Sequence, residues 1–437
     1  MRIVLIFDFV KSCSRTPRPV NISTRFNTFD AFRHRNYRFL WCGTALFSAG
    51  FWLQQVVVGW LAYEITGSPL MTSIALGLDA LPILFGAPLG GLLSDKYDKK
   101  LLLAMVFVYQ ALILLGYSII TMAGYAATWN LFFFVFLLGI SWVISDPARM
   151  SLLAVIIPRE ALINAFSLNS MAFSVMRLLV PAAAGFSLAL VGPSPLFMVE
   201  AVLMLSAALI VMMMRFGDDA SAAQRHEATG KIMLDLKSGL DYVIGEKTII
   251  GLACMTVITV ILIMPFSNGL MPVYAAEVFH VGPEGLGMLL SSAGLGSLIG
   301  TVALASFARI ERPGKILFIL LGGLGILMAM LGINHTYTGA LLLMMLLSGF
   351  MMTYFSISGA TVQGILPDKY RGRVTGIYMM AWGLMPVGSL ISGTIANIVG
   401  VQLSSLTGSS LIFLGLIIAT YYFKGVWNYR IKNNRDG

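Results

Sequence analysis

The chain contains twelve long apolar runs separated by short polar segments. A helix needs about 20 apolar residues to cross roughly 30 Å of hydrocarbon, so each run is long enough to span a membrane. Only 11% of the residues are charged, whereas a soluble globular protein carries about 25%. Backbone groups inside a bilayer must be paired within their own segment, which favours helices, and the alternating segments of a membrane barrel are lacking. The sequence therefore predicts an all-α membrane protein. The predicted spans are residues 38–63, 70–93, 101–122, 130–152, 162–190, 194–214, 248–272, 285–308, 315–333, 337–360, 374–399 and 404–423.

The longest polar interruption, residues 215–247, divides these spans six and six. Its second part has apolar residues at helical spacing, which fits an amphipathic helix on the membrane surface or a solvated linker equally well. The two halves also share a short sequence pattern. SMAF begins twelve residues after Pro158, and MMAW begins twelve residues after Pro367. Many secondary transporters are duplicated in this way, so we expect two pseudo-symmetric six-helix bundles. The expected organisation is a tail (1–37), a bundle (38–214), a central loop (215–247), a bundle (248–423) and a tail (424–437).

The basic residues predict the orientation. Of the 29 lysines and arginines, all but Arg177 lie in the two tails, the central loop and alternate short loops, or at the helix ends beside them. Because positive loops stay on the cytoplasmic side, we expect both termini and the central loop to be cytoplasmic in a cell membrane, which we take to be bacterial. The net charge of +9 then faces anionic lipid headgroups, with no need for nucleic acid.

Little in the sequence suggests a catalytic, metal-binding or phosphate-binding site. Cys13, Cys42 and Cys254 are far apart, the four histidines show no ligand spacing, and no phosphate-binding glycine-rich loop occurs. We therefore expect no metal, no cofactor and no catalytic residue. The first ten residues are apolar but too short to span, so we interpret them as an interfacial segment or the result of a mis-assigned start.

The loop between the second and third spans carries a recognisable motif. Its members are Gly91, Leu93, Asp95, Lys96, Lys99 and Lys100. In this position they resemble the signature loop of the major facilitator superfamily. Asp98 stands where that family usually has glycine, and aspartate tolerates a left-handed backbone better than most residues.

Two further stretches are similar to the macrolide-efflux and enterobactin-exporter branch of that superfamily. One is residues 360–378, with Gln363, Pro367, Arg371, Gly372, Arg373 and Val374. The other runs from Pro158 through Asn164 and Ala165 to Arg177, Pro181 and Gly185, with Val180 in place of a glycine. The resemblance covers residues 32–423 and implies proton-driven export by alternating access.

The resemblance also implies a cytoplasmic gate. In the family, the motif aspartate, here Asp95, faces the N-terminal end of span 11, where a helix dipole stabilises an anion by about 0.3–1 kcal/mol. Arg149 is the expected partner of Asp95, and the remaining gate candidates are Lys96, Lys99, Lys100, Arg371 and Arg373. The alternative is a solvated hairpin whose ion pairs contribute almost nothing. If the gate exists, Asp95→Asn leaves insertion intact and lowers transport.

Three ionisable residues, Asp79, Arg177 and Glu200, lie inside predicted spans, where each costs about 2.5–3.5 kcal/mol. Asp79 can carry the coupling proton, because a buried carboxyl group holds its proton more tightly. The alternatives are a structural pair with Arg177 and a hydrogen-bonded acid that stays neutral. Arg177, which stays charged, can bind an anionic substrate group or brace the structure. Glu200 is the third proton-coupling candidate, and a packing role is the alternative.

Spans 1, 4, 7 and 10 line the cavity in this family, which makes Phe51, Gln54, Gln55, Trp142, Asn268 and Tyr354 the candidate cavity residues. Aromatic side chains suit bulky amphipathic ligands, although any one of them can instead face lipid or pack. The predicted function is export of a drug, siderophore or metabolite by a monomer whose partners are that compound, protons and the bilayer. The alternatives are a proton-coupled importer and, in another class, a membrane receptor or enzyme.

Overall fold

The computed structural model describes residues 30–158, 161–215, 241, 243, 245–306, 311–367, 374, 378 and 380–429. Within these ranges, twelve helices are long and apolar enough to cross a membrane, and no strand occurs. The predicted all-α fold with twelve spans is therefore confirmed. The predicted central loop and the amphipathic helix within it lie almost wholly outside the described residues, and the predicted domain boundaries stay a prediction.

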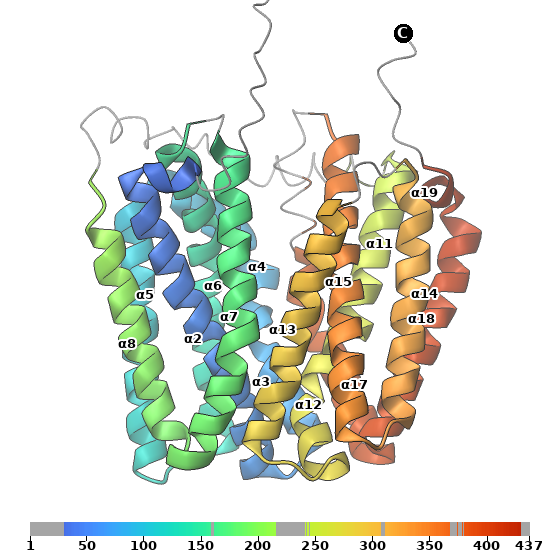
Figure 1. Ribbon diagram of the computed structural model, residues 1–437, viewed down its shortest axis with the longest axis horizontal. Coiled ribbons are helices and arrows are strands. Elements are labelled where there is room, and N and C mark those ends of the chain that lie inside the picture. The colour runs from blue at the N-terminus through green and yellow to red at the C-terminus, as the bar shows by residue number, and fades with distance from the viewer. Residues whose placement is uncertain are drawn as a thin grey trace, which may run out of the picture.

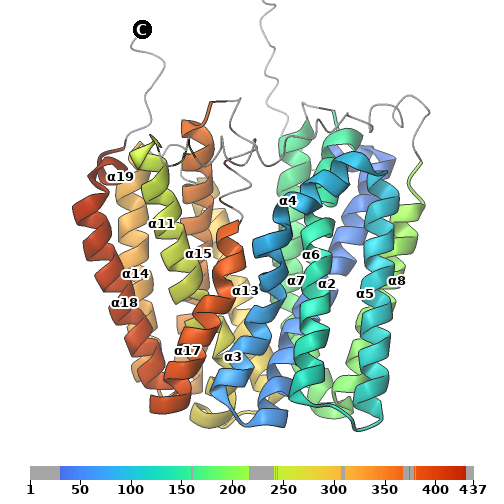
Figure 2. The same cartoon turned by 180° about the vertical axis from the view of Figure 1, so that it is seen from behind.

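The helices of the first half lie together on one side of the molecule, and those of the second half lie on the other (Figures 1 and 2). The first half consists of α2 (Arg35–Thr66), α3 (Pro69–Gly77), η2 (Leu78–Ala80), α4 (Leu81–Lys96), α5 (Lys99–Met122), α6 (Thr128–Ile156), α7 (Leu162–Val191) and α8 (Pro193–Met212), after a short turn η1 (Asp30–Arg33). The second half consists of α11 (Lys247–Leu262), η4 (Pro265–Gly269), α12 (Met271–Val273), η5 (Tyr274–Val278), α13 (Pro283–Ser306), α14 (Pro313–Ile333), α15 (Tyr337–Ile365), η6 (Ala381–Leu384), α17 (Met385–Val399), α18 (Val401–Tyr422) and α19 (Lys424–Asn428).

Three spans that the sequence predicts as continuous helices are interrupted. The second changes to a 3₁₀ turn at η2, the eleventh contains the 3₁₀ turn η6, and the seventh contains the π-helical turns η4 and η5. A proline follows each 3₁₀ turn, Pro82 in α4 and Pro386 in α17, and proline has no N–H to continue the helical ladder. The seventh span also continues to Val278, beyond its predicted end at residue 272.

The two interrupted helices face each other across the boundary between the halves. A Cβ added at Gly77 would lie 2.2 Å from Ser389 Oγ, and one added at Gly383 would lie 2.6 Å from Leu84 Cα. Only glycine allows such close approach between helices. The breaks at η2 and η6 therefore bring backbone from both halves together near the middle of the molecule.

The two ends of the molecule differ in charge. At the end where α2 begins and α4 ends, uppermost in Figure 1, lie basic residues such as Arg35, Lys96 and Lys100. The opposite end carries Glu64, Glu277 and Glu284 and, among the described residues, no lysine or arginine. We refer to these as the basic end and the acidic end. The predicted orientation, in which the basic end faces the cytoplasm, stays a prediction.

Candidate functional site

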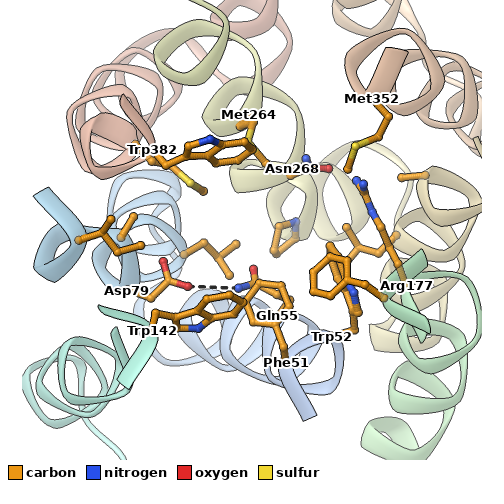
Figure 3. A pocket seen from close by; sticks show the side chains of 18 residues that line it. Phe51, Trp52, Gln55, Asp79, Trp142, Arg177, Met264, Asn268, Met352 and Trp382 are labelled. Atoms are coloured by element: carbon orange, nitrogen blue, oxygen red, sulfur yellow. Dashed lines mark hydrogen bonds between the residues drawn. The ribbon is translucent and has the colours of Figure 1, made fainter. Parts of the chain in front are cut away.

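A cavity of about 270 Å³ lies between the two halves (Figure 3). Its wall contains side chains from α2, η2, α6 and α7 of the first half and from η4, α13, α15 and η6 of the second. Four of the six predicted cavity residues line it: Phe51, Gln55, Trp142 and Asn268. Two of the three predicted membrane-embedded ionisable residues, Asp79 and Arg177, line it as well.

The structure places the other candidates elsewhere. Gln54 is 6% exposed and does not line the cavity, because adjacent helical residues point about 100° apart. Tyr354 is fully buried outside the cavity wall. Glu200 is buried in α8 against α2, where a Cβ on Gly50 would lie 3.2 Å from Glu200 Cγ.

Asp79 reaches the cavity because it lies in the 3₁₀ turn η2. Gln55 Nε2 donates to Asp79 Oδ2 over 3.5 Å, a long hydrogen bond that provides little stabilisation. Behind it, α6 approaches so closely that a Cβ on Gly139 would lie 2.3 Å from the Asp79 carbonyl oxygen. The carboxyl group is therefore held at the cavity wall by backbone packing and stays available for another partner.

Arg177 lies on the other side of the cavity, in α7 (Figure 3). It is 3% exposed, and its guanidinium carbon lies 4.9 Å from the centre of the Trp52 ring. Arg177 Nε has no hydrogen-bond partner among the residues that the structure describes. Although both residues are described, no ion pair joins Arg177 to Asp79, so the structural pair that was one alternative from the sequence is not formed.

Aromatic rings form much of the remaining wall. Phe51 contacts Trp142 with ring centres 4.9 Å apart and Trp52 with ring centres 5.0 Å apart, both edge to face. Phe51 also stacks on Phe173 at 6.0 Å. Several lining residues were not predicted from the sequence: Trp52, Phe173, Met264, Met352, Trp382 and Met385. Trp52 and Phe173 both contact Phe51 in the folded structure. The hydrophobicity of the sequence does not reveal such contacts, so it could not place these two residues at the cavity.

The motif loop between α4 and α5 is built around Asp98. Asp98 has φ −59° and ψ 116°, so the left-handed conformation considered from the sequence is wrong. Its side chain accepts a hydrogen bond from Leu101 N at 2.8 Å and thereby caps α5. Aspartate can replace the family glycine here because the position needs a capping group and no positive φ.

The basic gate candidates make contacts within the first half. Lys100 Nζ donates to Met214 O at the end of α8 over 2.7 Å, Lys99 is 7% exposed, and Lys96 lies over the Tyr97 ring at 5.6 Å. Arg149 pairs with Asp146 and lies 5.3 Å from the centre of the Phe47 ring. The side chain of Asp95, and all of Arg371 and Arg373, lie outside the described residues, so the Asp95 gate stays a prediction.

Twelve spanning helices in two halves, with a cavity between them, are the arrangement expected of a major facilitator superfamily transporter, and the family comparison assigns the chain to that class. The chain belongs to the family of transmembrane secretion effectors, whose model matches residues 26–428. Members of this family and the relatives described below are transporters and not enzymes, which confirms that prediction.

The chain is similar in sequence to two transporters and in fold to a third. The staphyloferrin A transporter of Staphylococcus aureus (strain NCTC 8325 / PS 47) is 24% identical over 404 residues, covering 92% of this chain and 99% of that protein. Macrolide efflux protein A of Streptococcus pyogenes is 21% identical over 392 residues, covering 87% and 94%. A crystal structure of a mutant nucleoside transporter NupG has a TM-score of 0.73 at 14% identity, covering 89% of this chain and 100% of that chain.

Proposed function

We propose that the chain exports a small amphipathic organic compound, which binds in the cavity between the halves, and that proton entry through Asp79 drives the export. The observation that carries this proposal is the cavity itself: it combines an aromatic wall with two membrane-buried charged residues, Asp79 and Arg177. An ionisable residue inside a membrane is costly and therefore indicates a function. Export is favoured because the relatives include proteins named for efflux.

Hydrogen bonds join the halves toward the acidic end. Ser73 Oγ and Ser392 Oγ are 3.0 Å apart, Ser68 Oγ donates to Asn397 Oδ1 over 3.1 Å, and Tyr63 Oη donates to Glu277 Oε1 over 3.0 Å. Each is worth about 0.5–1.5 kcal/mol, a strength that ligand or proton binding can overcome. Under the predicted orientation, these bonds close the cavity toward the outside.

The test uses everted membrane vesicles from cells that overproduce the protein. A macrolide, the cationic dye ethidium and an aromatic carboxylate serve as probes of different charge. We expect at least one probe to accumulate when a proton gradient is imposed and to be released when an uncoupler is added. Vesicles carrying the Trp142→Ala variant should accumulate less, because that ring forms part of the cavity wall.

The importer alternative predicts the opposite polarity. In that case, right-side-out vesicles would accumulate the probe in response to a proton gradient and everted vesicles would not. Accumulation that is unaffected by the uncoupler would reject proton coupling while leaving transport in place.

A further inference from the structure

The backbone of Arg177 is fixed at the boundary between the halves. Pro181 has no N–H to donate to the Arg177 carbonyl four residues earlier, so this carbonyl lacks its usual helical partner. Gly294 of α13 packs against it, and a Cβ there would lie 2.4 Å from the Arg177 oxygen. Next to the break, Ala182 N donates to Ser291 Oγ over 2.9 Å. Two helices from different halves therefore hold Arg177 in place.

The charge of Arg177 has no counterion. In the part of the chain that the structure describes, Arg177 forms neither an ion pair nor a side-chain hydrogen bond, although it is 3% exposed. The guanidinium carbon lies over the Trp52 ring, and a cation–π contact compensates for only part of the desolvation of a buried cation. A buried guanidinium of this kind is ready to receive an anion, to which it can donate two parallel hydrogen bonds.

The guanidinium points into the cavity and not away from it. In Figure 3 it extends from α7 toward Asn268 and Met352, which belong to the second half. Asp79 lies on the opposite wall beside Gln55, and the wall between the two charges consists largely of aromatic rings. A ligand that fits this arrangement has one anionic group at Arg177 and an apolar body among the rings. A second negative group at the far wall would meet Asp79.

We infer that Arg177 is the anion-binding residue of the cavity and that the transported compound is an amphipathic monoanion with one carboxylate or similar acid group. This inference rests on the proposed function, since it assumes that the cavity binds the substrate. A bound anion would contact Arg177 from one half and Asn268 from the other, so it would bridge the two halves. The competing explanation is that Arg177 only braces α7 against α2 through Trp52.

The test compares two probes of nearly the same shape, naphthalene-2-carboxylate and its neutral carboxamide. Binding to the full-length protein in lipid nanodiscs is measured by isothermal titration calorimetry. We expect the carboxylate to bind about tenfold or more tightly than the carboxamide, since a hydrogen bond to a charged group is roughly twice as strong as a neutral one. Arg177→Gln should reduce this ratio to about one, and Arg177→Lys should retain part of it.

Lys315→Gln is the matched control, because Lys315 also lies over a tryptophan ring, Trp427 at 5.5 Å, but does not line the cavity. Its ratio should equal that of the wild type. Trp142→Ala should weaken both probes together. If the carboxylate and the carboxamide bind the wild type equally, or if Arg177→Gln keeps the ratio, the anion site is rejected while the cavity remains a binding site. If neither probe binds, both the anion site and binding of such ligands in the cavity are rejected.

Discussion

Asp79 illustrates how one residue acquires a role from its local backbone. In a regular helix it would be one more position on the second span, but the 3₁₀ turn η2 turns it to the cavity wall. Among the described residues, its one side-chain partner is Gln55, at the limit of hydrogen-bond distance. The second buried carboxyl group, Glu200, lies on α8 away from the cavity. From the sequence both acids were proton-coupling candidates, with a packing role as the alternative for Glu200, and of the two only Asp79 lines the cavity.

Asp79→Asn should abolish proton-coupled transport and leave membrane insertion unchanged, because the amide has nearly the same shape but carries no transferable proton. The measurement is probe accumulation in everted vesicles with and without an imposed pH gradient, together with the protein level in the membrane. Glu200→Gln is the control, and we expect it to retain the gradient-driven component. Unchanged gradient dependence in Asp79→Asn would assign the proton to another group.

Asp98→Ala should destabilise the protein by about 1 kcal/mol, because it removes the side chain that caps α5. Asp98→Gly should cost only a few tenths of a kcal/mol, as glycine is itself an acceptable capping residue. The comparison is made by thermal unfolding of the purified protein in detergent. A glycine variant that is as unstable as the alanine variant would contradict the assignment of Asp98 as a cap.

At the residue scale, the sequence predicted part of the cavity wall. It predicted that Phe51, Gln55, Trp142 and Asn268 line a cavity because they are polar or aromatic positions on spans that the family resemblance places there. It could not distinguish Gln54 from Gln55, because both fit the composition and only the rotation of α2 separates them. The rotation of α15 was likewise not visible in the sequence, and it places the Tyr354 side chain inside the second half and not at the cavity.

At the scale of helices, prolines and glycines act in pairs. Pro147 in α6 has no N–H for the carbonyl of Val143, and a Cβ on Gly90 of α4 would lie 1.8 Å from that oxygen. The same relation joins Pro181, through the Arg177 carbonyl, to Gly294. Each proline thus frees a carbonyl group, and a glycine of the neighbouring helix packs directly against it. Such close helix contacts replace the hydrophobic effect, which is absent between helices in lipid.

Gly90→Ala should destabilise the first half by about 1–3 kcal/mol, because the added methyl group would overlap the Val143 carbonyl. Gly91→Ala is the matched control, since a Cβ there meets nothing within 4 Å. The measurement is the midpoint of thermal unfolding in detergent. Equal effects of the two substitutions would show that the contact between α4 and α6 contributes little.

The twelve spans themselves were predictable, because a run of apolar residues must form a helix in lipid whatever its neighbours are. The interruptions at η2 and η6 were not predicted. Hydrophobicity is the same on both sides of each break, and Pro82 and Pro386 alone do not distinguish a broken helix from a regular one. Whether the helix is broken depends on its contact with the backbone of the other half. This is a tertiary contact, which the sequence does not show.

At the scale of the whole molecule, the two halves should move relative to each other during transport. A cysteine pair replacing Ser73 and Ser392, in a background without Cys13, Cys42 and Cys254, should form a disulfide, because the two hydroxyl oxygens are 3.0 Å apart. We expect oxidation to block probe accumulation in vesicles and a reducing agent to restore it.

The control pair replaces Ser118 and Ser194, whose hydroxyl oxygens are 3.2 Å apart within the first half. Cross-linking this pair should leave transport intact. Transport that continues at the wild-type rate through fully cross-linked Ser73 and Ser392 variants would contradict movement at the acidic end.

The missing counterion of Arg177 has an electrical consequence. A bound monoanion neutralises Arg177 but is released without it, because the arginine stays with the protein, so each turnover carries net charge across the bilayer. In a cell whose interior is negative, outward movement of one negative charge is favoured by about 2.3 kcal/mol per 100 mV. Voltage alone would then expel the compound, even with no difference in acidity between the two sides.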